Sequence, residues 1–258
     1  MVAAALRADR GGFAGRMVRP ALAAMVAVIG ASAQAADSAS SASSLYSAKV
    51  IVTGRDNLAE RERGIREALP LVVTKVAADP AIGDRALSQG WEAKAAGLVE
   101  AFDYVDRKAG IQISDEQGTR ERSFILTVRF VPAAIDSAVR QLGGEPWTES
   151  RPTVDVALEI QDGGSPYRLT ETSEKGYGQR LALHDEADKV GLPVTIGAQG
   201  TSNYRLEGLM TITPAGYWNT SWTLTGPSLD ERFGFENTTF DAAIARALGR
   251  SAKALAKR

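Results

Sequence analysis

The sequence predicts an α+β fold built from two small α/β sandwiches, each with a largely antiparallel sheet packed against helices. Three observations predict it: alternating apolar segments occur in both halves of the chain, amphipathic helical patterns lie between them, and a stretch rich in glycine and proline separates the halves. We therefore expect an N-terminal domain over residues 45–142, a linker over residues 143–152 and a C-terminal domain over residues 153–258.

The first 35 residues have the pattern of a signal peptide that is removed on export. Arginines precede the apolar run Ala21–Ile29, and Ala33 and Ala35 form an Ala-x-Ala cleavage site. Cleavage after Ala35 leaves Ala36–Ser44 as a flexible, Ser/Ala-rich lead-in and places the protein in the periplasm without a stable membrane span. The alternative is an uncleaved segment that anchors the protein in the inner membrane, although the apolar run is shorter than the roughly 20 residues that a span requires.

Charge and cysteine content exclude several classes of function. The chain has 30 basic and 31 acidic residues and a formal charge of −1; the signal segment holds four arginines and one aspartate, so the remaining chain carries −4. A chain without basic excess has little to neutralise phosphates with, so we expect no nucleic-acid partner. Because the sequence contains no cysteine, disulfides, thiol nucleophiles and thiolate metal ligands are excluded.

A strand and the helix after it organise the N-terminal domain. Residues Leu45–Thr53 alternate between an apolar face and a mixed face, as a strand with one buried side does. Asn57 is the expected helix N-cap, Glu60 completes a capping box, and Pro70 predicts a kink or break. The helix has one apolar face, formed by Leu58, Ile65, Leu69, Val72 and Val76.

The remaining elements of the N-terminal domain complete a β-α-α-β-β-α order. Residues Ala78–Gly90 contain one proline and two glycines and are predicted to be a loop, and Trp91–Ala101 is predicted to be a helix. Phe102–Ile113 and Glu121–Val131 are predicted to form a hairpin with its turn at residues 115–118, and a helix starts at Pro132. This order predicts a three-stranded, largely antiparallel sheet with helices on one face.

The C-terminal half is predicted to follow a β-α-β-β-β-β-α order. Its clearest feature is a hairpin, because apolar residues alternate on both sides of a Pro-Ala-Gly turn. The predicted elements are a strand from Val154 to Ile160, a helix over Ser173–Val190, a short strand over Leu192–Ile196, the hairpin Tyr204–Thr213 and Tyr217–Thr225, a strand over Arg232–Glu236 and a closing helix capped by Thr239.

No constellation in the sequence points to catalysis, so we predict no catalytic residue, no cofactor and no metal site. The single histidine, His184, shares a helical face with Asp188, but a metal site needs three or four ligands and no second cluster follows. We interpret this segment as a charged, solvated helix face. Gly-x-Ser-x-Gly, dinucleotide-binding and phosphate-loop motifs are absent from the sequence.

Three tryptophans are candidate binding aromatics. Trp147 lies in the linker, where it could bind a ligand, although we favour a role in filling the interface between the domains. Trp218 and Trp222 share one face of a strand and could form a ligand platform, although we favour burial under the closing helix.

From Leu45 onward the chain resembles an exported bacterial family known as domain of unknown function 2066. The resemblance is carried by LYSAKVIV at residues 45–52, by REAL at residues 66–69 and, most specifically, by VRFVPAAIDSAVRQLGGEPWTESRPTVDVAL at residues 128–158. It implies export and a setting in the cell envelope, and it transfers no catalytic residue.

These observations favour a non-catalytic periplasmic binding or assembly module whose partner is another envelope protein or a cell-wall component. The first alternative is a carboxylate-dependent periplasmic hydrolase with its site at the domain junction near Trp147, because paired carboxylates leave no local sequence signature. The second alternative is a structural protein tethered to the membrane by the uncleaved segment Ala21–Ile29.

Overall fold

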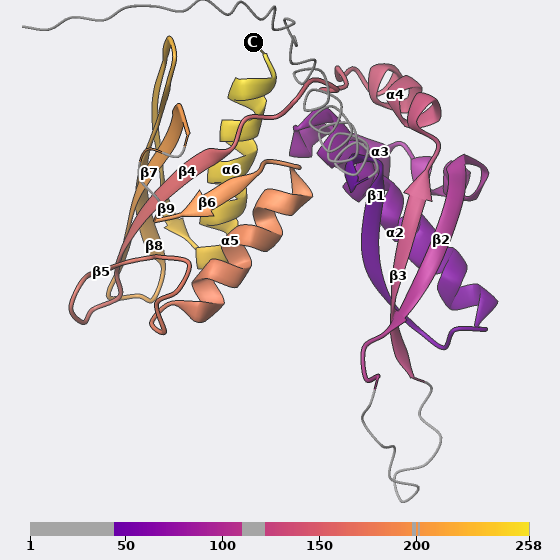
Figure 1. Cartoon of the computed structure of the whole chain (residues 1–258), viewed down its shortest axis with the longest axis horizontal. Helices are drawn as coiled ribbons and strands as arrows, with labels where there is room; N and C mark the ends of the chain where they lie inside the picture. The colour runs from indigo at the N-terminus through magenta and orange to yellow at the C-terminus, as the bar shows by residue number, and fades with distance from the viewer. Residues whose placement is uncertain (1–43, 110–121, 198–199, 201, 258) are drawn as a thin grey trace, which may run out of the picture. The chain divides into compact units, whose positions relative to one another are not determined.

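The computed structural model describes residues 44–109, 122–197, 200 and 202–257, and it has the predicted α+β fold (Figure 1). Two sheets are present, one of three strands and one of six, each with its own hydrophobic core. The predicted signal peptide, nearly all of the lead-in, the turn at residues 115–118 and the strand ends at Ile113 and Glu121 lie outside the described residues.

The first sheet has the strand order β1-β3-β2, and both strand pairs are antiparallel. Its strands are β1 (Ser47–Thr53), β2 (Val99–Asp106) and β3 (Ser123–Phe130), so the predicted pairing of the second and third strands is confirmed. Its helices include α2 (Leu58–Ala77) and α4 (Pro132–Gln141).

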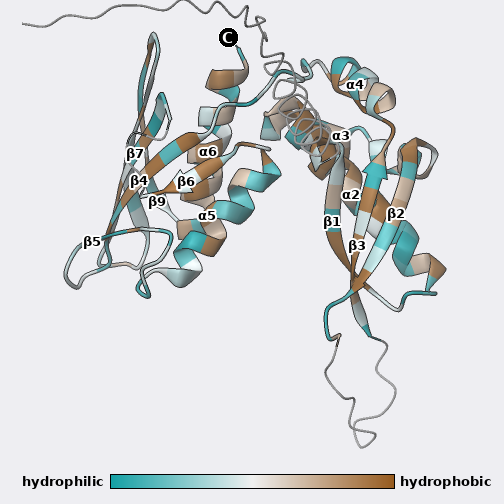
Figure 2. Ribbon diagram, viewed as in Figure 1, coloured by the Kyte–Doolittle hydropathy of each residue, from teal (hydrophilic) through white to brown (hydrophobic). Residues whose placement is uncertain are grey.

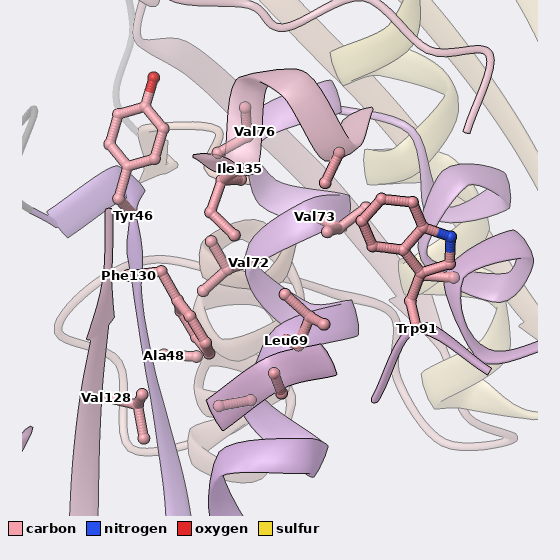
Figure 3. Packing of buried hydrophobic residues seen from close by; sticks show 14 of the residues in the cluster. Tyr46, Ala48, Leu69, Val72, Val73, Val76, Trp91, Val128, Phe130 and Ile135 are labelled. Atoms are coloured by element: carbon pink, nitrogen blue, oxygen red, sulfur yellow. The ribbon is translucent and has the colours of Figure 1, made fainter. Parts of the chain in front are cut away.

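The core of this unit lies between one face of the sheet and α2. Phe130 from β3, Leu69 and Val72 from α2 and Ile135 from α4 are all fully buried and pack together (Figure 3). Gly64 allows the helix to approach closely, because a Cβ atom there would lie 2.7 Å from a methyl carbon of Val52. Close packing of this kind leaves the helix little freedom to shift on the sheet.

Helix α2 differs from the prediction in three details. Asn57 caps it as expected, accepting a hydrogen bond from the amide of Glu60 at 3.2 Å, but the Glu60 carboxylate accepts from the amide of Thr53 instead of completing the capping box. The helix continues through Pro70 to Ala77, so no break occurs there. Leu58, in the first turn, is exposed rather than part of the buried face.

The segment that was predicted to be a loop contains a helix, α3 (Pro80–Ser88). The side chain of Asp79 caps it by accepting from the amide of Ala81 at 3.1 Å, and Pro80 occupies the first turn, where its missing amide proton has no cost. Gly83 marks a close contact with α2 rather than a turn, since a Cβ atom would lie 3.0 Å from the Pro70 carbonyl oxygen.

The predicted helix over Trp91–Ala101 is also wrong in part. Trp91–Leu98 forms a 3₁₀ helix, η1, and β2 begins already at Val99. The earlier start of β2 adds a β-bulge between Val99 and Ala101, where the pairing with β3 shifts register.

The second sheet has the order β5-β4-β7-β8-β9, with β6 paired to β4 beside β5. It is mixed, because β4 pairs in parallel with β6 and β7 while the other pairs are antiparallel. Its strands are β4 (Val154–Gln161), β5 (Tyr167–Arg168), β6 (Val194–Ile196), β7 (Tyr204–Ile212), β8 (Trp218–Gly226) and β9 (Leu229–Thr238).

Two helices cover one face of the second sheet. They are α5 (Tyr177–Lys189), shorter at its start than predicted, and α6 (Phe240–Ala256), capped by Thr239 as predicted. Apolar residues alternate with hydrophilic ones along the strands, as Figure 2 shows for β4, and the apolar set is buried. The predicted hairpin is confirmed as β7 and β8, the last predicted strand is longer at both ends, and β5 was not predicted.

Trp222 fixes the packing of this sheet at Gly208, its cross-strand partner on β7. A Cβ atom at position 208 would lie 2.3 Å from the indole ring, far inside van der Waals contact. We therefore expect Gly208→Ala to lower the free energy of unfolding by about 1–3 kcal/mol, measured by urea denaturation. In a Trp222→Leu background the same substitution is expected to cost much less; an equal cost in both backgrounds would contradict the packing.

Over the described ranges, none of the helices combines the length and the apolar character that crossing a membrane requires.

Candidate functional site

The structure buries the three predicted binding aromatics to different degrees and does not bring them together on an exposed surface. Trp222 is 2 % exposed in the second core, and Trp218, on the same face of β8, packs edge-on against Phe240 with ring centroids 5.6 Å apart. Trp147 is 6 % exposed and its amide donates to the Val76 carbonyl oxygen at 2.9 Å. All three therefore serve packing in this structure.

Arg151 organises the junction between the two units. Its guanidinium donates to carbonyl oxygens near the end of α2, to the Trp147 carbonyl oxygen and to carbonyl oxygens just after α5, and it stacks on the Trp147 ring at 4.6 Å. A cation at two helix C-termini is favourably placed because their carbonyl oxygens carry the negative end of the helix dipole. Burial lowers the pKa of Arg151 to about 10.

Two ion pairs also connect the N-terminal and C-terminal halves at this junction. The buried Lys75 ammonium lies 3.2 Å from the Asp188 carboxylate, and Lys253 lies 2.6 Å from Asp79. Within the stretch predicted to be a linker, Pro146 and Trp147 are buried and Arg151 is hydrogen-bonded. The acids next to Trp147 in sequence, Glu145 and Glu149, are exposed.

His184 and Asp188 each contact a different side chain and do not form a common site. The Nε2 atom of His184 lies 3.0 Å from Glu171, while Asp188 pairs with Lys75. Partial burial acts to raise the pKa of Glu171, but hydrogen bonds from His184 and from the Ile196 amide outweigh burial and lower it. In the part of the chain that the structure describes, no group of three or more His, Asp or Glu side chains is arranged to hold a metal ion.

The second sheet has a shallow hollow on its helix-free face, with a volume of about 270 Å³. Ala157, Ser221 and Thr223 are among its lining residues and leave room above the strands. The hollow also contains two ion pairs, Glu159–Arg168 at 3.6 Å and Arg205–Glu207 at 2.8 Å. Because these charges already neutralise one another, the hollow offers a charged ligand little gain.

The helix-free face of the first sheet carries a row of aliphatic side chains across all three strands. Ile125 on β3 pairs with Ile51 on β1 and with Val105 on β2, so the three side chains lie side by side on this face. Ile51 is 51 % exposed and Val105 58 % exposed, and Ile125 is partly buried between them. We call these three residues the apolar row.

Sequence reasoning did not identify the apolar row. Its only local signal is Ile51, an apolar residue among Ser47, Lys49 and Thr53 on the mixed face of the first strand. The row itself appears only when the register aligns residues that are far apart in the chain.

The two edge strands of the first sheet, β1 and β2, differ in whether side chains cover their outward backbone groups. The hydrogen bond from the Phe130 amide to the Tyr46 carbonyl oxygen shows that even-numbered residues of β1 face β3, so odd-numbered ones direct their backbone groups outward. Side chains of α2 cover these outward groups. Lys75 donates to the Ser47 oxygen at 3.4 Å, Arg63 donates to the Ile51 oxygen at 2.8 Å, and Glu60 accepts from the Thr53 amide at 3.0 Å.

Charge pairing at this edge gives a pH-dependent prediction. Hydrogen bonds from Arg63 and from the Thr53 amide lower the pKa of Glu60 to about 2. Because the folded-state pKa is lowered, the stabilisation is fully present above the ordinary value of 4.5 and is lost as the pH falls through about 2. An NMR titration of the Glu60 carboxyl carbon should show a midpoint near 2 that moves up towards 4.5 in Arg63→Met, and stays in place in the matched control Arg61→Met.

Comparison with known proteins gives a family match of unknown function. Residues 39–148 match the family model described as a domain of unknown function (DUF8605), a span that covers the first sheet and its helices and ends within the junction. No curated protein matches the sequence. A crystal structure of protein XCC0632 from Xanthomonas campestris, assigned to the family model DUF330, is 12 % identical, with 42 % of this chain and 84 % of that chain covered and a TM-score of 0.21. This last likeness is too low to support any argument.

Proposed function

We propose that the protein is exported and acts in the cell envelope as a non-catalytic binding or assembly module that docks a polypeptide on the helix-free face of its first sheet. The observation that carries the proposal is the apolar row of Ile51, Ile125 and Val105. The export and the envelope setting rest on the signal pattern before Ala36 and on the resemblance to domain of unknown function 2066.

The row supports docking because of its position. Single exposed apolar residues are ordinary on protein surfaces, but a contiguous set on one sheet face is a feature of interaction sites. Lys49 and Asp103 flank the row at the next register position, one on each outer strand. An apolar centre with a charged rim is the usual composition of a protein–protein interface.

The two glutamates whose pKa shifts are resolved support a non-catalytic role. A carboxyl group that acts as a general acid needs a raised pKa, which burial or a like charge provides. The two glutamates with resolved shifts, Glu60 and Glu171, both have lowered pKa values because hydrogen-bond donors stabilise their charged forms. At the junction near Trp147, where a hydrolase site was the alternative, the charged groups packed among the carbonyl oxygens are the cations Arg151 and Lys75. The buried carboxylate of Asp155, on β4, accepts hydrogen bonds from the Thr195 hydroxyl and the Ser202 amide.

The proposal is tested by co-purification of a tagged full-length chain from its native host. In the variant Ile51→Ser/Val105→Ser, recovery of the bound polypeptide, identified by mass spectrometry, should fall at least fivefold, because two large aliphatic contacts are lost. The matched control is Leu87→Ser/Leu181→Ser, which replaces two aliphatic residues of similar exposure on other elements. Equal recovery with both variants would contradict the proposal.

A further inference from the structure

Strand β2 forms an open edge of the first sheet. The hydrogen bond from the Arg107 amide to the Ser123 carbonyl oxygen shows that odd-numbered residues of this part of β2 face β3. Phe102 and Tyr104 therefore direct their amide and carbonyl groups away from the sheet. Among the described residues, these groups have no hydrogen-bond partner.

The contrast with the edges formed by β1 and β9 makes this one distinctive. On β1, three side chains of α2 occupy the outward backbone groups, which obstructs a further strand. On β9, the outer strand of the second sheet, the residues with side chains on the helix-free face include the oppositely charged Asp230 and Arg232, which form an ion pair at 3.4 Å. On β2, the corresponding acidic residue is Asp103, which forms no ion pair among the described residues, and Val105 continues the apolar row to the edge.

We propose that β2 binds its partner by strand addition, taking an extended polypeptide segment that carries an aliphatic residue and, two positions away, a lysine or arginine. This inference rests on the proposed function and names the class of partner. The added strand pairs its backbone with Phe102 and Tyr104. On the helix-free face its aliphatic residue lies opposite Val105 and extends the apolar row, and its basic residue lies opposite Asp103.

Charge selects this partner over a second copy of the chain. Two β2 strands pairing antiparallel in the register centred on Asp103 would place the Asp103 carboxylates of both copies directly opposite one another, and like charges in that position repel. Among the described residues Asp103 has no ion-pair partner either: Thr127 lies between it and Lys49 in the same row, and Arg129 lies diagonally from it, opposite Ala101. A lysine or arginine of the added strand, placed opposite Asp103, would neutralise this carboxylate.

The test uses a short, end-blocked peptide in which valine and lysine alternate at every second position, with threonine between them. Binding to the full chain is measured by fluorescence anisotropy, and hydrogen exchange locates it. We expect the amides of Phe102 and Tyr104 to exchange at least tenfold more slowly with the peptide bound, while the amides of Asp230 and Arg232 on β9 remain unchanged. Protection at both edges, or at neither, would overturn the inference.

Charge reversal supplies the specificity control. Asp103→Lys should weaken binding of the valine–lysine peptide about fivefold or more and strengthen binding of a valine–glutamate peptide. Asp230→Lys, which changes an equally acidic and exposed position on β9, should alter the affinity for neither peptide. Equal effects of both substitutions would mean general electrostatic attraction and would overturn the inference. If these tests fail while Ile51→Ser/Val105→Ser still loses its polypeptide, strand addition is wrong and the docking function stands; if both fail, both are wrong.

Discussion

Replacing Arg151 with alanine is expected to lower the free energy of unfolding by about 3–5 kcal/mol, measured by urea denaturation. The reason is that the guanidinium serves five carbonyl oxygens, those of Lys75, Val76, Trp147, Val190 and Gly191. Alanine removes this shared donor. The Lys75 and Val76 oxygens keep the amides of Ala78 and Trp147, but the Trp147, Val190 and Gly191 oxygens lose the guanidinium, and the group that stacks on the Trp147 ring is gone.

Two further variants separate geometry from charge. Arg151→Lys keeps the charge, but one ammonium cannot reach acceptors on both helices as the two terminal nitrogens of the guanidinium do, so it should recover less than half of the loss. Arg168→Ala is the matched control, since Arg168 is 71 % exposed and forms one ion pair at 3.6 Å; it should cost less than about 1 kcal/mol. A similar small loss for Arg151→Ala would contradict its central place in the junction.

Trp222→Ala is expected to lower the free energy of unfolding by about 3–5 kcal/mol, because it removes a large, almost fully buried side chain from the second core and leaves a cavity. Trp222→Phe should cost about 1 kcal/mol, since the smaller ring keeps most of the contact and also removes an indole N–H that has no hydrogen-bond partner among the residues that the structure describes. Circular dichroism followed during thermal unfolding measures both. Full stability in Trp222→Ala would show that the residue is not part of the core and would restore it as a candidate binding aromatic.

The parts of the fold that follow from local periodicity could be predicted from the sequence. Alternation predicted β4, β7 and β8, and the capping residues Asn57 and Thr239 marked the starts of α2 and α6. These features depend on residues within one turn or one strand. They therefore leave a clear signal in a single sequence.

The errors arose where one residue type serves two purposes. Pro80 and Gly83 predicted a loop, but the proline starts α3 and the glycine lets α3 lie against α2. The glycines and prolines of residues 143–152 predicted a linker, and this stretch contains no helix or strand; what composition did not show is that its Arg151 hydrogen-bonds to carbonyl oxygens of both halves. Local composition does not distinguish a turn from a close contact.

The candidate site could not be predicted because it depends on register. Ile51, Val105 and Ile125 become neighbours only through the pairing of β1 and β2 with β3. The open edge at Phe102 and Tyr104 depends in addition on where the bulge between Val99 and Ala101 falls. A slip of one residue would move every one of these side chains to the opposite face.

The most direct test of the docking surface is site-specific photocrosslinking in the native host, with a photoreactive residue placed at Ile51, Val105, Leu87 or Leu181. These positions have similar exposure, between 50 % and 58 %, so differences in yield report on the partner rather than on accessibility. The predicted result is one discrete polypeptide adduct, the same at Ile51 and Val105 and missing at Leu87 and Leu181. Adducts of equal yield at all four positions, or adducts at the two control positions alone, would contradict the account.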